Sequence, residues 1–171
     1  MLPYIEKSII QLERAGADFI VLPCNTLHLL LPYLRKKFKI QILDMAEEVS
    51  KSISHYNKIG VLCTTKTMEE KLYDSLLKEK VVYPNKQEQE ELSEIIVRII
   101  RKEFVKKDIF ILENIIKNLF SKGCEIILLA CTDIGNLINS NDRIIDTTDI
   151  LIESIKKKLN LNNYQKAINL L

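Results

Sequence analysis

The sequence contains few cysteines and histidines, the residues that most often bind zinc. It contains four cysteines and two histidines among 171 residues, and no two cysteines have CxxC spacing. This pattern argues against a zinc site, which needs four closely spaced ligands of these types. It is also unlike the dense disulfide framework of a small secreted domain. We therefore expect four free thiols and no bound metal.

Other absences narrow the class of protein further. No apolar run reaches the ~18 residues that a membrane span requires, and the first residues lack the basic-then-apolar order of a signal peptide. A net charge of +2 is too small to indicate nucleic-acid binding. There is no GxGxxG, no P-loop and no lysine context typical of pyridoxal phosphate. These absences predict a cytoplasmic globular protein without a cofactor and without a membrane or nucleic-acid partner.

Short apolar runs alternate with helical patterns along the chain. The predicted strands are 19–23, 40–43, 58–63, 81–83, 126–129 and 144–146. The predicted helices are 5–15, 26–38, 45–54, 67–80, 85–104, 109–121 and 134–137, with a closing helix that begins at Thr148 or Asp149. Alternation of this kind predicts an α/β fold with parallel sheets flanked by helices.

The strands divide unequally between two similar lobes. Residues 58–147 supply four strands and are predicted to form the second lobe, whereas residues 1–57 and 148–171 supply two strands to the first. A pair of parallel strands leaves an exposed edge, which proteins normally cover. We therefore expect the first lobe to be truncated at its N-terminal side.

One segment occurs twice, once in each half of the chain. It begins at Gly16 and at Gly123, has an acidic residue two positions later, continues as an apolar run, and reaches Cys24 or Cys131 eight residues after the glycine. Ligands of α/β proteins gather at the carboxyl ends of the strands, where both cysteines are predicted to lie. Two thiols that face one substrate can remove a proton from one side and return it on the other.

Polar residues accompany both cysteines. Asn25, Thr26 and Thr132 offer hydrogen-bond donors for a substrate carboxylate, and a helix is predicted to begin beside each thiol. The alternative is a pair of structural cysteines, because free cysteine is among the most buried residue types. The duplicated context favours the acid–base pair.

The segment from Gly16 to His28 resembles the signature of the cofactor-independent aspartate racemases, in the aspartate/glutamate racemase superfamily. In that family the cysteine of Pro-Cys-Asn-Thr is one catalytic base, and it maps onto Cys24. Residues 130–133 (Ala-Cys-Thr-Asp) resemble the Gly-Cys-Thr-Glu motif of the second base, and residues 59–67 are similar to the Ala-Thr-x-Gly-Thr loop. The resemblance extends to about Leu159.

The resemblance implies an amino-acid racemase that acts on aspartate or glutamate. Cys24 and Cys131 would be the acid/base pair. The substrate would be held by Asn25, Thr26, Thr64, Thr132 and Asp133, with Arg101 near a position where a substrate-contacting lysine is typical. Related enzymes are often dimers, so a homodimer is one expected assembly.

The sequence also departs from the family pattern. Alanine replaces glycine at 130, aspartate replaces glutamate at 133, and Lys66 stands where glycine is usual. The family's glycine-rich first strand, first helix and second strand are missing, together with a basic residue for the distal carboxylate. An alternative is therefore a truncated homologue that is catalytically impaired, only binds a ligand, or requires a partner.

A third alternative keeps an enzyme but changes the reaction, because related folds include hydantoin racemases, maleate isomerases and decarboxylases. The string Pro-Cys-Asn-Thr-Leu-His argues against these reactions. The remaining candidates have simpler interpretations. Cys63 and Cys124 are predicted to pack in the core, His55 to lie in a solvated turn, and His28 to sit in the first turn of a helix.

Overall fold

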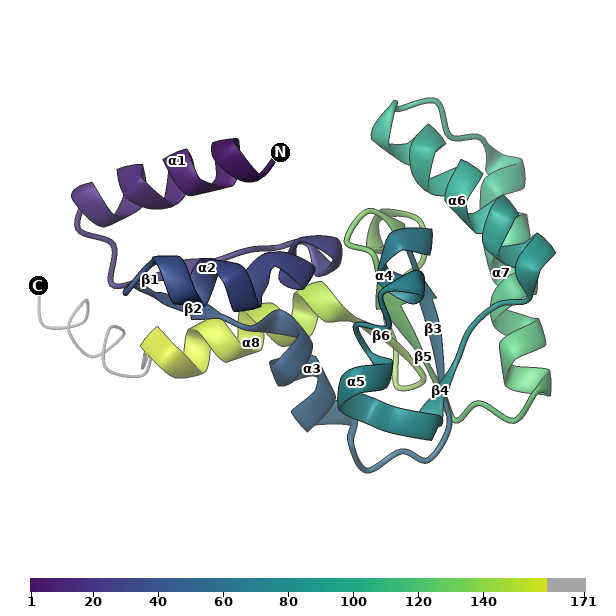
Figure 1. Cartoon of the computed structure of the whole chain (residues 1–171). Coiled ribbons are helices and arrows are strands. Elements are labelled where there is room, and N and C mark those ends of the chain that lie inside the picture. The colour runs from purple at the N-terminus through teal and green to yellow at the C-terminus, as the bar shows by residue number, and fades with distance from the viewer. Residues whose placement is uncertain (160–171) are drawn as a thin grey trace, which may run out of the picture.

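The computed structural model describes residues 1–159, in which the strands form two separate parallel sheets (Figure 1). The strand order is β1-β2 in one sheet and β4-β3-β5-β6 in the other. The strands are β1 (Phe19–Val21), β2 (Gln41–Leu43), β3 (Ile59–Cys63), β4 (Val81–Val82), β5 (Ile126–Ala130) and β6 (Ile144–Asp146). All these pairings are parallel, which confirms the predicted α/β class.

Helices connect the strands as the crossover rule requires. The α-helices are α1 (Leu2–Arg14), α2 (Leu31–Lys37), α3 (Met45–Ile53), α4 (Thr65–Glu69), α5 (Asp74–Leu77), α6 (Lys86–Ile100), α7 (Lys106–Ser121) and α8 (Thr147–Leu159). Three short 3₁₀ segments are η1 (Asn25–Leu30), η2 (Lys78–Lys80) and η3 (Ile134–Asn136). The start of α6 has a capping box, in which the Asn85 side chain accepts from Glu88 N and Glu88 accepts from Asn85 N.

The four-stranded sheet is covered on both faces. Its central strands β3 and β5 are buried at every residue, and they pair from Ile59 with Ile126 to Cys63 with Ala130. Leu62 and Leu129 face α6 and α7, whereas the alternate residues pack against α3, α5 and α8. Strands buried on both sides read as continuous apolar runs, which is why the sequence predicts them well.

The two-stranded sheet has a smaller core. Ile20 and Ile42, one from each strand, pack with Ile9 of α1 and with Leu31 and Leu34 of α2. Helix α8 runs from the end of β6 toward this sheet (Figure 1). There Lys158 of α8 donates a hydrogen bond to Gln41 of β2 (2.6 Å).

The predicted division into two lobes stays a prediction. Helix α3, assigned by sequence to the first lobe, buries Met45 and Val49 in the same core cluster as Val61 and Leu128 of the four-stranded sheet. Residues 160–171, which the prediction places in the first lobe, lie outside the described residues.

Three helix predictions are wrong in detail. The single helix expected over residues 67–80 is broken into α4, α5 and η2, because Lys71 and Lys78 have φ angles of 53° and 58° that a helix does not allow. The helix expected to reach Phe104 ends at Ile100, and Lys102 beyond it also has a positive φ of 59°. The helix expected from Thr26 begins as the 3₁₀ segment η1 and becomes α-helical only at Leu31.

Two classes of feature are missing from the part of the chain that the structure describes. None of its helices combines the length and the apolar composition needed to cross a membrane. Likewise, residues 1–159 hold no group of three or more histidine, cysteine, aspartate or glutamate side chains that could bind a metal ion.

Candidate active site

The two copies of the repeated segment begin with the same backbone turn. Gly16 follows α1 with φ = 83°, and Gly123 follows α7 with φ = 88°. In both turns the glycine N–H and the next residue's N–H donate to the carbonyls of the preceding helical turn, at Glu13 and Leu12 or at Phe120 and Leu119, over 2.9–3.2 Å. This is the Schellman arrangement, which needs a residue that tolerates positive φ.

Cys131 lies directly after β5 and is buried, with 7% of its surface exposed. Its Sγ is 3.8 Å from a carboxylate oxygen of Asp133. Burial raises the pKa of the Cys131 thiol to about 11, an effect that the backbone N–H groups of Asp133 and Ile134 oppose and the negative charges of Asp133 and Cys24 reinforce. Cys131 is therefore protonated at neutral pH.

Cys24 lies in the loop that follows β1 of the smaller sheet. It stands three residues after the end of β1, in extended backbone at the start of η1, and it is partly exposed. His28 holds its backbone: Met45 N donates to His28 Nε2 (2.9 Å), so Nε2 is unprotonated and Nδ1–H donates to the Cys24 carbonyl (2.9 Å). His28 is 3% exposed, and its two hydrogen bonds hold the Cys24 loop beside the first residue of α3.

Asn25 ties the same loop to the larger sheet. Its Nδ2 donates to Thr147 Oγ1 (3.1 Å), its Oδ1 accepts from the Tyr73 hydroxyl, and Thr147 in turn donates to the Leu129 carbonyl (3.1 Å). We call this chain of hydrogen bonds the Asn25 clamp. Asn25, Tyr73 and Thr147 are almost completely buried, and Leu129 is two residues before Cys131. The clamp therefore joins the Cys24 loop to the strand that carries Cys131.

Three threonine hydroxyls form a second junction. Thr26 Oγ1 lies 2.9 Å from the hydroxyl oxygens of both Thr64 and Thr67, which are 3.0 Å apart. Thr64 also caps α4 by accepting from Thr67 N (3.2 Å). Thr26 belongs to η1, Thr64 is the N-cap of α4 and Thr67 lies in its first turn, so the cluster joins the segments that follow β1 and β3.

Thr67, Tyr73 and Thr147 were not among the site residues predicted from the sequence. Thr67 could have been found, because Thr64 and Thr67 have the spacing of a side-chain N-cap. Tyr73 and Thr147 have no local signal, since each bonds a residue that is distant in the sequence.

The remaining predicted site residues are Thr132 and Asp133, beside Cys131, and Arg101, at the end of α6. Thr132 and Asp133 follow Cys131 directly and are half-buried. Arg101 is exposed at the C-terminal end of α6, where it shares a groove with Arg98 and other α6 residues. Within residues 1–159 no hydrogen bond or ion pair joins Arg101 to the cysteine site. Lys66 is also exposed, and it forms an ion pair with Glu70.

The loop after Cys131 is held against β6 by a close approach. A Cβ atom added to Gly135 would lie 1.9 Å from an Asp146 carboxylate oxygen. The other oxygen of Asp146 accepts from Thr148 N (2.7 Å) at the start of α8. Glycine is therefore required at 135 for the segment that carries Asp133 to pack beside Asp146.

The two remaining cysteines are buried in the core, as predicted. Cys124 is 2% exposed in the cluster between the sheet and helices α6 and α7. Cys63 is completely buried on the opposite face, and this burial, followed by the nearby Cys131, raises the pKa of its thiol to about 12. Neither is in position to ionise at neutral pH.

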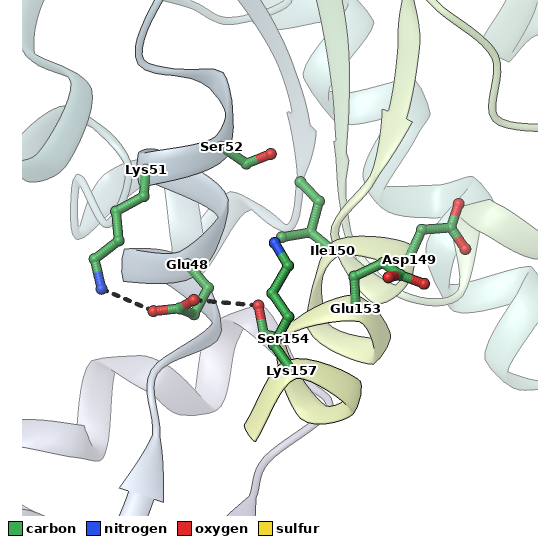
Figure 2. Close-up of a pocket in the computed structure, with 8 residues that line it drawn as sticks. All are labelled: Glu48, Lys51, Ser52, Asp149, Ile150, Glu153, Ser154 and Lys157. Carbon is green, nitrogen blue, oxygen red and sulfur yellow. Dashed lines mark hydrogen bonds and ion pairs between the residues drawn. The ribbon is translucent and has the colours of Figure 1, made fainter. Parts of the chain in front are cut away.

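A cavity of about 560 Å³ lies elsewhere, between α3 and α8 (Figure 2). Its polar lining is largely paired: Glu48 accepts from Lys51 (2.7 Å) and from Ser154 (3.2 Å). No predicted site residue lines this cavity. The cavity is therefore a gap between two helices, lined by polar side chains that are mostly paired with one another.

Comparison with known proteins matches the chain to racemases by family model, by sequence and by structure. The family model described as Asp/Glu/Hydantoin racemase matches residues 2–155. The chain is 29% identical over 152 residues to the broad specificity amino-acid racemase RacX of Bacillus subtilis, covering 85% of this chain and 66% of RacX. The chain thus spans just under two thirds of the length of that curated relative.

Solved structures agree with the family model. An aspartate racemase homologue from Pyrococcus horikoshii matches with a TM-score of 0.71 and 30% identity, covering 86% of this chain and 69% of that chain. The aspartate racemase of Picrophilus torridus matches with a TM-score of 0.77 and 23% identity, covering 91% and 68% respectively, and this likeness supports the fold alone.

Proposed function

The chain belongs to the Asp/Glu/hydantoin racemase family, and we propose that it is an amino-acid racemase in which Cys24 and Cys131 act as the acid/base pair. The observation that carries this proposal is the Asn25 clamp, which joins the Cys24 loop to β5, the strand that Cys131 follows. Nothing in the sequence near either cysteine requires such a connection. Such a clamp is expected if the two thiols must keep a constant separation across a substrate.

The proposed reaction moves one proton at a time. One thiolate removes the α-proton, the C–H electron pair passes into the α-carboxylate as a carbanion, and the opposite thiol delivers its proton to the other face. Cys131, protonated at neutral pH, is the donor when Cys24 acts as the base. The opposite enantiomer uses the two thiols in exchanged roles. The chemistry balances without a cofactor or a metal ion.

The proposed substrate contacts come from hydroxyl groups. Thr26, Thr64 and Thr132 would hold the α-carboxylate and stabilise the charge that develops on it. Asp133, 3.8 Å from the Cys131 sulfur, would orient that thiol or the substrate ammonium. Direct contacts from Asn25 and Arg101 remain predictions. The family supports aspartate or glutamate as the substrate, while a homodimer and a cytoplasmic location also stay predictions.

The test is to incubate the chain with L-aspartate, and separately with L-glutamate, in deuterated water. NMR would follow loss of the α-proton signal, and chiral chromatography would follow appearance of the D-enantiomer. We expect both, without added cofactor and in the presence of a chelator. Retention of both activities by the Cys24→Ala/Cys131→Ala double variant would contradict the proposal.

A second candidate is a homologue that binds an amino acid without racemising it, or that needs a partner chain. Its supporting observation is the small size of the first sheet, two strands of three residues each, in a chain that spans 66% of RacX. Aspartate would then shift the NMR signals of Thr26 and Thr64, yet its α-proton would not exchange in deuterated water.

A further inference from the structure

The outer surface of α6 carries exposed apolar side chains. Val97 and Ile100 in the helix are 45% and 63% exposed, and Phe104 in the turn that follows is 47% exposed. Residues three apart on a helix are neighbours on its surface, so Val97 and Ile100 form one apolar patch. A helix that packs on one side only normally has polar side chains on the other. Apolar side chains grouped in this way indicate a contact surface.

An open groove of about 360 Å³ follows the same surface. Its lining residues are Ser93, Glu94, Val97, Arg98 and Arg101. All of them belong to α6 and its C-cap, so the groove lies along one helix rather than between two. Helices pack by placing the ridges of one into the grooves of another. The groove therefore has the form that a second helix requires.

The charges on this surface are separated along the helix. Glu94 stands three residues before Val97, and Arg101 stands four residues after it. Arg101 has no ion-pair partner within residues 1–159, and Glu94 has only Arg98 at 3.4 Å, which pairs more closely with Asp108 (2.8 Å). Glu94 and Arg101 are both exposed, so each can take a partner from outside the chain.

A second copy of the same helix supplies both partners. If two copies of α6 lie antiparallel with their Val97 side chains together, Arg101 of one copy comes within one residue, about 1.5 Å along the axis, of Glu94 of the other. Glu90, one turn before Glu94, adds a second carboxylate nearby. The two-fold axis repeats these ion pairs. A parallel pair would instead bring Glu94 against Glu94 and Arg101 against Arg101. We propose that α6 joins two copies of this chain as an antiparallel pair centred on Val97.

The proposed interface is small, and this sets its strength. Helix α6 has 15 residues, so it is about 22 Å long. One face of such a helix buries less than the ~800 Å² per partner of a standard interface, and we expect a weak dimer with a Kd of about 10–100 µM. Sedimentation velocity of the full chain over about 10–500 µM measures this constant. In ¹⁵N NMR, the amide signals of Val97 and Ile100 should shift over the same range of concentrations.

Charge reversal tests the ion pairs. Arg101→Glu places like charges together on both sides of the two-fold axis and should raise the Kd about tenfold. Glu94→Arg/Arg101→Glu reverses both charges in each copy, so opposite charges meet again and most of the affinity should return. Lys117→Glu makes the same change of charge on the exposed surface of α7 and should leave the Kd unchanged. Circular dichroism checks that each variant keeps its helices.

A second substitution tests the apolar centre. Val97→Glu removes the contact between the two valines and brings two carboxylates together, so it should also raise the Kd about tenfold. Its matched control is Ile152→Glu on α8, because Ile152 is 44% exposed and Val97 is 45% exposed. We expect Ile152→Glu to dimerise as the unchanged chain does.

A chain that stays monomeric at the highest concentration would overturn the proposal and would mean that solvent or a different partner covers α6. Dimerisation that survives both Val97→Glu and Arg101→Glu would also overturn it, because the contact would then lie elsewhere. Loss of the dimer in Arg101→Glu without recovery in the double variant would overturn the antiparallel register. The readout is association, so it is independent of whether the chain racemises amino acids.

Discussion

The segments that end at Cys24 and Cys131 share a sequence pattern but differ in structure. Both begin with a glycine in a Schellman turn, yet β1 has three residues with one buried, whereas β5 has five and all are buried. The difference comes from their neighbours. β5 lies between β3 and β6 with helices on both faces, while β1 pairs with β2 alone among the strands of residues 1–159. The repeat thus specifies the turn, and the surrounding sheet determines the length of the strand.

This difference extends to the thiols. Cys131 is positioned by its own strand, because it follows the last residue of β5 directly. Cys24 stands three residues beyond β1, and side chains of His28, Asn25 and Thr26 hold its loop against other elements. One half of the site is therefore built by local structure and the other by tertiary contacts.

The largest expected effect is on catalysis. Cys24→Ala and Cys131→Ala should each lower the rate of racemisation by about 10²–10⁴-fold, because each removes one partner in proton transfer. Each single variant should still exchange the α-proton of one enantiomer with deuterated water, since one base remains. Chiral chromatography and NMR measure the two quantities. Cys124→Ala, at a core position away from the proposed pair, is the control. If either single variant, Cys24→Ala or Cys131→Ala, racemised at the full rate, the two cysteines could not be an acid/base pair.

The buried position of Cys131 predicts a loss of stability at high pH. Its folded pKa of about 11 is above the ordinary thiol value, so its contribution is fully present below about pH 8.5 and lost as the pH rises through 11. Between pH 8 and pH 11 the chain should lose about 2 kcal/mol more unfolding free energy than Cys131→Ala does. Urea unfolding at the two pH values measures this difference. Equal losses in both proteins would show that Cys131 is not buried as described.

Breaking the Asn25 clamp should affect the Cys24 side specifically. Thr147→Val keeps the side-chain volume but leaves Asn25 Nδ2 and the Leu129 carbonyl without this partner, at a cost of about 1–3 kcal/mol in unfolding free energy. The Cys24 loop would loosen, so kcat should fall more than KM rises. Thr148→Val, at the next and half-buried position, should change neither. Equal effects of the two substitutions would argue against the clamp.

The smallest effect tests the shared turn. Gly16→Ala and Gly123→Ala should each cost about 1 kcal/mol, since alanine disfavours positive φ. Within residues 1–159 neither substitution adds a steric clash, because no atom lies within 4 Å of an added Cβ at Gly16 and the nearest atom at Gly123 is Lys58 Nζ at 3.7 Å. Thermal unfolding followed by circular dichroism measures the two losses. A much larger loss at one glycine would show that the turns are not equivalent.

The sequence predicted the elements whose signals are local. The apolar runs of β3 and β5 appear where the pattern places them, and α3 and α6 begin within one residue of the predicted starts. The helix expected over residues 67–80 fails because the buried Tyr73 and the positive φ angles of Lys71 and Lys78 interrupt it. Helix propensity in this stretch is overridden by packing against the sheet.

The sequence by itself determined the α/β class, the parallel strands and the position of each cysteine near a strand end. These features depend on residues close together in the chain, through hydrophobic period and turn chemistry. Only the tertiary structure decided that Asn25 bonds Tyr73 and Thr147, which are 48 and 122 residues away in the sequence. Hydrogen bonds between such distant residues leave no periodic pattern, because they exist only after both sheets have packed. The contacts that join the Cys24 loop to the strand before Cys131 belong to this second kind.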